Sequence, residues 1–122
     1  MMKKIAIIPY VTIGRNAQIG HDGHFNIFKK SRSAVLKENL QAALERNNHH
    51  IEVIVDVNHG DMQLLKREGV DLFLIPDDIA GYVDYEGINA AACFKLSHDE
   101  YENGYVERVL EYIEKWNGDG MA

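Results

Sequence analysis

The run from Val70 to Ile75 constrains the fold more than any other segment, because five of its six residues are apolar and Pro76 follows directly. A strand with one face in water alternates apolar and polar side chains, whereas a strand covered by helices on both faces reads as a nearly continuous apolar run. Proline donates no hydrogen bond to a strand ladder, so this strand is expected to stop there. The run therefore predicts the central strand of a parallel sheet.

Three further segments predict strands beside it. Lys4 to Ile8 is a compact apolar run before Pro9, and apolar residues alternate from Ile51 to Val57. Ala91 to Leu96 is a fourth candidate of moderate β-propensity. These segments alternate with helical patterns, and parallel strands in one sheet require such crossovers.

Three segments carry the helical patterns. The first starts at Ser31 or Ser33, which can cap it, and ends near Asn47. A shorter helix lies between Asn58 or Asp61 and Gly69. The last carries an apolar stripe of Val106, Val109, Leu110 and Ile113 and is followed by Gly118. Residues 76–87 are read as a loop or short helix, and residues 11–25 and 97–104 as connections.

The predicted fold is α/β, a three-layer sandwich with a short four-stranded parallel sheet and helices on both faces. A chain of 122 residues fits one domain. We assign residues 1–117 to it and residues 118–122 to a frayed tail.

Composition excludes several classes of partner. The formal net charge is −6, and no basic cluster is longer than the stretch Lys29 to Arg32, so we expect no nucleic-acid partner. No apolar stretch approaches the roughly 20 residues of a membrane helix, so no membrane insertion is expected. The segment from Met1 to Val11 is too short for a signal peptide, and the single Cys93 permits no internal disulfide. A cytoplasmic location is the expectation.

Histidines and carboxylates gather in the segments that follow the predicted strands. Ligands of parallel sheets bind beyond the carboxyl ends of the strands. His59, Asp77 and His98 are the candidate catalytic residues there, because imidazole titrates near neutrality and a carboxylate can orient it. Such a group suits acid–base chemistry, phosphoryl transfer or a divalent metal, and the metal stays open. The alternative is that loops are simply polar.

The long connection after the first strand supplies candidate ligand-binding residues. Its glycines let backbone amides approach a ligand, and basic or aromatic side chains add contacts. The candidates are Gly14, Arg15, Gly20, His24 and Tyr82. No mononucleotide or dinucleotide phosphate motif is present, and no cofactor is identified. The alternative is an ordinary surface loop.

Three segments, which together make up most of the chain, carry a family resemblance: Val70 to Tyr82, Ala92 to Trp116 and Ser31 to Val57. They resemble the B component of lactose/cellobiose-type sugar phosphotransferase systems. The resemblance implies a small cytoplasmic domain with a four-stranded parallel sheet. That family carries phosphate on a cysteine directly after the first strand, where this chain has Pro9-Tyr10-Val11. No catalytic cysteine is therefore carried over.

Three hypotheses follow. The first is a regulatory or small-ligand-binding module of this type, without the usual cysteine, that uses residues 12–26. The second is a small enzyme that uses the His59, Asp77 and His98 group, with or without a metal. The third is a protein-interaction subunit, including a homodimer, whose contact face holds Tyr101, Tyr105, Tyr112 and Trp116.

Overall fold

The computed structural model describes residues 2–13, 17–20 and 31–118. Their centre is a four-stranded parallel sheet in the order β4-β1-β5-β6. The strands are β1 (Lys4–Ile7), β4 (Glu52–Val55), β5 (Leu72–Pro76) and β6 (Cys93–Leu96). All four predicted strands are confirmed, and every residue of β5 is buried, as its apolar run indicates.

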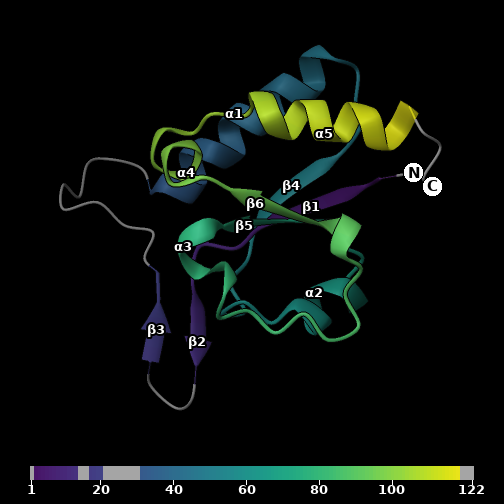
Figure 1. Cartoon of the computed structure of the whole chain (residues 1–122). Coiled ribbons are helices and arrows are strands. Elements are labelled where there is room, and N and C mark those ends of the chain that lie inside the picture. The colour runs from purple at the N-terminus through teal and green to yellow at the C-terminus, as the bar shows by residue number, and fades with distance from the viewer. Residues whose placement is uncertain (1, 14–16, 21–30, 119–122) are drawn as a thin grey trace.

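Helices cover both faces of this sheet (Figure 1). One face carries α1 (Arg32–Arg46), α4 (His98–Asn103) and α5 (Glu107–Gly118). The other face carries α2 (Met62–Arg67) and α3 (Asp77–Ala80), and a short 3-10 turn, η1 (Ala90–Ala92), precedes β6. The predicted α/β three-layer arrangement is confirmed.

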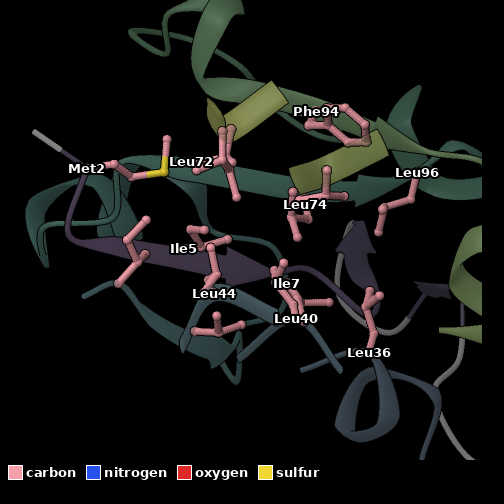
Figure 2. Packing of buried hydrophobic residues seen from close by; sticks show 14 of the residues in the cluster. Met2, Ile5, Ile7, Leu36, Leu40, Leu44, Leu72, Leu74, Phe94 and Leu96 are labelled. Carbon is pink, nitrogen blue, oxygen red and sulfur yellow. The ribbon is translucent and has the colours of Figure 1, made fainter. Parts of the chain in front are cut away.

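The core divides into two clusters because successive side chains of a strand point to opposite faces. In β1, Ile5 and Ile7 pack with the helices α1 and α5, as Figure 2 shows for Leu36, Leu40 and Leu44. Ala6, from the same strand, belongs to the cluster under α2 and α3. Both faces of the sheet are therefore apolar, as expected of a parallel sheet covered by helices on both sides.

The connection after β1 differs from the prediction. It contains an antiparallel hairpin of β2 (Val11–Ile13) and β3 (Ala17–Ile19), in which Val11 pairs with Ile19. The alternation of Val11, Thr12 and Ile13 is a strand signal that the interpretation as an irregular connection passed over. Residues 14–16 and 21–30 lie outside the described residues.

Residues 97–104 also differ from the prediction, because most of them form α4. Ser97 caps this helix, and its hydroxyl accepts from the Glu100 amide while the Glu100 carboxylate accepts from the Ser97 amide. The helix ends at Gly104, whose φ of 70° suits glycine.

The last helix also runs slightly further than the sequence predicts. Gly118 is the final residue of α5, and residues 119–122 of the predicted tail are outside the described part of the chain. Throughout that described part, every helix is too short or too polar to cross a bilayer.

Candidate functional site

The sheet has a switch point between β1 and β5. From β1 the chain crosses to β4 on one side, and later strands are added on the other side through β5. The loops that leave β1 and β5 therefore run in opposite directions, which opens a crevice beyond their carboxyl ends. A pocket of about 180 Å³ lies there, which we call the switch-point pocket. Its lining residues are Pro9, Gly20, Pro76, Asp78, Ile79, His98, Tyr101 and Glu102.

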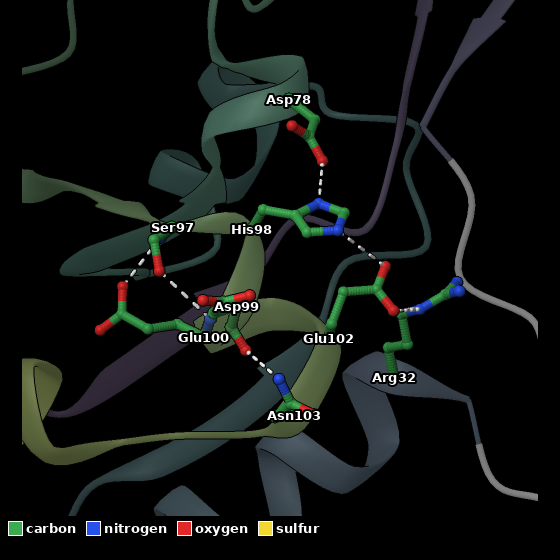
Figure 3. Close-up of polar contacts among 8 residues, drawn as sticks. All are labelled: Arg32, Asp78, Ser97, His98, Asp99, Glu100, Glu102 and Asn103. Atoms are coloured by element: carbon green, nitrogen blue, oxygen red, sulfur yellow. Dashed lines mark hydrogen bonds and ion pairs between the residues drawn. The ribbon is translucent and has the colours of Figure 1, made fainter.

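His98 belongs to this lining and lies between Asp78 and Glu102 in a network of polar contacts (Figure 3). It is the first residue of α4, and its Nδ1 lies 2.9 Å from Oδ2 of Asp78. Its Nε2 faces Oε1 of Glu102 at 3.9 Å, one helical turn further along. The hydrogen bond to Asp78 raises the pKa of His98, and the charges of Asp78, Glu102 and Asp99 act in the same direction. The arrangement favours the imidazolium form.

Arg32 extends the network to a third helix. Its Nε donates to Oε2 of Glu102 at 2.7 Å, and Arg32 is the first residue of α1. Asp78, His98, Glu102 and Arg32 thus connect α3, α4 and α1 through charged groups. These contacts hold α4 in place at the mouth of the pocket.

Glu100 fixes α4 from its other side. Its carboxylate accepts from Nη2 of Arg108 at 2.6 Å and from Nε at 3.0 Å, and Glu100 itself is buried. The hydrogen bond from Arg108 lowers the pKa of Glu100 despite this burial. Tyr101, which is also buried, forms part of the pocket lining next to it. The helix that carries His98 is therefore anchored.

Gly20 is the part of the predicted ligand-binding loop that reaches the switch-point pocket. Its φ is +88°, and a Cβ there would lie 2.6 Å from Cγ2 of Ile79 and 3.1 Å from the carbonyl oxygen of Pro9. A side chain would therefore collide with Ile79 of α3 and press against the backbone that follows β1. The structure assigns this glycine to close backbone packing.

The structure separates His59 from His98. His59 follows β4, where its Nδ1 lies 3.2 Å from Oγ1 of Thr12 and its ring meets Tyr10 edge-on at 5.3 Å. Two strands stand between β4 and β6, which corresponds to ~14 Å at the usual strand spacing. Asp77 is exposed at the start of α3, directly after β5, which is the strand next to β6. The predicted catalytic group is therefore spread across the edge of the sheet.

The other predicted binding residues contribute no described contact to the pocket. Tyr82 is 52% exposed and is not part of the lining. Gly14, Arg15 and His24 lie outside the described residues.

The aromatic residues of the predicted contact face are largely used inside the domain. Tyr101 is buried, and Tyr112 and Trp116 pack against the core with their ring centroids 6.1 Å apart. Tyr105 alone among the four is mostly exposed, at 52%. These four residues therefore do not form a continuous exposed aromatic face.

Sequence reasoning missed Glu102 and Arg32 as members of the site. The spacing of His98 and Glu102 by four residues places both on one face of a helix, and the pair Ser97 and Glu100 is a capping-box signature. Together these signals predict α4 and its charged face. No local signal predicts the contact from Arg32, which is 70 residues from Glu102 in the chain.

The chemistry available at this site is hydrogen bonding by two carboxylates and an imidazole whose pKa they raise. In the described part of the chain, no group of three or more histidine, cysteine or acidic side chains is placed to hold a metal ion. Comparison of the chain with family models, with curated proteins and with solved structures found no match.

Proposed function

We propose that this chain is a small-ligand-binding module, similar in fold to the phosphotransferase B component but without transfer of phosphate through cysteine. The ligand would occupy the switch-point pocket. The observation that carries the proposal is the position of Asp78, His98 and Glu102 together in the walls of a pocket at the crevice between β1 and β5. Parallel sheets bind ligands at such a crevice in general.

The charges around the pocket favour a neutral or cationic ligand that donates hydrogen bonds. Two carboxylates, Asp78 and Glu102, belong to the lining, and Asp99 adds a third negative charge close to His98. His98 and Arg32 compensate only part of this charge. Carboxylates accept hydrogen bonds from hydroxyl and ammonium groups, whereas they repel phosphate.

The same geometry argues against a phosphorylated His98. A histidine accepts a phosphoryl group through the lone pair of a neutral ring nitrogen. Asp78 faces one nitrogen of His98 and Glu102 faces the other, and both carboxylates raise its pKa. Carboxylates that face both nitrogens also repel an incoming phosphoryl group.

Amide chemical shifts test the proposal. We would titrate ¹⁵N-labelled protein separately with ethanolamine, glycerol and inorganic phosphate and follow the amides of Gly20, Asp78 and His98. We expect saturable shifts with ethanolamine or glycerol and none with phosphate. Asp78→Asn is expected to weaken the binding by about tenfold, because it removes a charged hydrogen-bond partner.

His49→Ala is the matched control. His49 also pairs with a carboxylate, Glu114 at 2.8 Å, but it belongs to a different part of the surface. The variant should bind as the wild type does. Shifts with phosphate alone, or an equal loss of binding in Asp78→Asn and His49→Ala, would contradict the proposal.

A further inference from the structure

A second and larger pocket follows the free edge of β6. This strand pairs with β5 alone in the described sheet, so its other edge is open. The pocket encloses about 540 Å³, which is within the range of small-molecule sites, and we call it the edge pocket. Its lining residues are Tyr85, Ile88, Ala90, Cys93, Phe94, Lys95, Arg108 and Tyr112.

The walls of the edge pocket are aromatic and held in place. The ring centroids of Phe94 and Tyr112 lie 5.4 Å apart. The Tyr85 hydroxyl donates to the carbonyl of Ala80 at 2.6 Å, and the Tyr112 hydroxyl donates to that of Ala91. Because both hydroxyls already donate to backbone, the rings provide mainly apolar surface to an occupant.

The charged groups of this lining are both cations. Lys95 and Arg108 belong to it and no carboxylate does, although the whole chain has a net charge of −6. Because Arg108 is already paired with Glu100 behind it, the uncompensated positive charge comes from Lys95. The Arg108 guanidinium lies 4.9 Å from the centre of the Phe94 ring. Lys95 is exposed and forms no ion pair among the described residues. The positive charge of Lys95 beside aromatic walls is complementary to an aromatic anion.

Arg108 also disfavours the addition of a peptide strand at this edge. Its Nη2 donates to the carbonyl of Lys95 at 3.0 Å, and the Cys93 amide donates to the carbonyl of Ala90. An added strand needs free amide and carbonyl groups along the edge. With these groups already paired, the pocket suits a small molecule better than a strand.

We propose that the edge pocket binds a small molecule with a flat aromatic body and one carboxylate group. The aromatic body packs along the edge of β6 against the aromatic side chains of the lining, which come from both faces of the sheet. The carboxylate lies near Lys95, which has no ion pair among the described residues. This site is separate from the switch-point pocket and takes a ligand of opposite charge preference.

Cys93 provides a built-in reporter, because it lines the pocket and is the only cysteine of the chain. The probes are naphthalene-2-carboxylate and its neutral counterpart, naphthalene-2-carboxamide. We would measure the rate at which iodoacetamide alkylates Cys93 in the folded protein at rising probe concentration. Measurement at alkaline pH is needed, since burial raises the pKa of this thiol. We expect both probes to slow alkylation, with the carboxylate half-effective at about tenfold lower concentration because of its charge.

Lys95→Glu tests the role of charge without touching a buried group. We expect it to abolish the preference for the carboxylate over the carboxamide, while Lys115→Glu, on the exposed side of α5, keeps it. Lys95 also lowers the pKa of Cys93, so each rate is compared with that of the same variant without probe. Three results would overturn the proposal: equal protection by the two probes, protection by neither, or an unchanged preference in Lys95→Glu.

Discussion

The switch-point pocket and the edge pocket are built from adjoining parts of the fold, yet their charges are opposite. Asp78 and Glu102 give the first an acidic wall, whereas Lys95 gives the second a cation that has no ion pair among the described residues. Glu100 stands between them, since it caps the helix that begins at His98 and pairs with Arg108. The comparison shows how one anchored helix, α4, contributes to two pockets of different charge, for which we propose different ligands.

The largest expected effect is a loss of stability in Gly20→Ala. Comparison with Gly87→Ala distinguishes the cost of close packing from the cost of backbone strain. Gly20→Ala should lower the free energy of unfolding by about 2–4 kcal/mol. The change places a Cβ on a backbone with positive φ and forces it against Ile79. It should also abolish binding at the switch-point pocket and spare the edge pocket. Gly87 has a φ of +75° and nothing within 4 Å of the position that a Cβ would take, so Gly87→Ala should cost only about 1 kcal/mol. Urea unfolding measures both, and equal costs would refute the close-packing role of Gly20.

Glu100→Ala should affect both pockets at once. We expect a loss of about 2–3 kcal/mol, because the change removes a helix cap and a charged hydrogen bond to Arg108. The pKa of Glu100 is lowered in the folded state, so its stabilisation is present above its unfolded pKa and is lost as the pH falls through the folded value. The stability difference between wild type and variant should therefore shrink in acid.

Urea midpoints measured across a pH series test this prediction. Glu111→Ala changes an exposed glutamate on α5 and serves as the control. A pH-independent difference between wild type and Glu100→Ala would argue against the ion pair as the source of stability.

Removal of single hydroxyls from the edge pocket should have a smaller effect. Tyr85→Phe and Tyr112→Phe should each lower the free energy of unfolding by about 1 kcal/mol, because each deletes one hydrogen bond to backbone. Tyr105→Phe alters a largely exposed ring and should change little. Thermal unfolding compares the three variants. A loss of stability in Tyr105→Phe as large as in the other two would count against the hydrogen bonds of Tyr85 and Tyr112 as the source of the effect.

The smallest effect is a change of titration at the switch-point pocket. Asp78→Asn should lower the pKa of His98 toward the ordinary histidine value, because the largest cause of its elevation is the hydrogen bond to Asp78. A raised pKa means that the contact stabilises the fold below the unfolded pKa and that this contribution is lost as the pH rises through the folded value. NMR titration of the His98 ring measures the shift. The exposed Glu86→Gln change is the control, and an unaltered His98 titration in Asp78→Asn would contradict the geometry.

The sequence predicts the sheet well, because the apolar pattern of each strand depends only on residues within that strand. The apolar run at residues 70–75 and the alternation at residues 51–57 each report the faces of one strand, and β5 and β4 lie where these patterns indicate. The hairpin and α4 were missed for a different reason. Both elements are short. A helix of only six residues is marginal by itself, so the capping pair Ser97 and Glu100 is weak evidence for α4.

The candidate site is harder to predict, because its members meet only through the fold. His98 and Gly20 were identified from residue type and position, and both line the switch-point pocket. The fold adds what residue type could not show: Gly20 packs closely against Ile79, and His98 contacts Asp78 and lies apart from His59 of the predicted group. The contact of Arg32 with Glu102 depends on the packing of α1 beside α4, which no spacing in the sequence encodes.

Native mass spectrometry of the protein purified gently from its own source tests the central claim most directly. The wild type is expected to carry a bound small molecule that contains no phosphate, and the Asp78→Asn variant is expected to lose it while His49→Ala retains it. A wild-type chain that carries no small molecule, or one that bears a phosphoryl adduct on a histidine, would contradict the account.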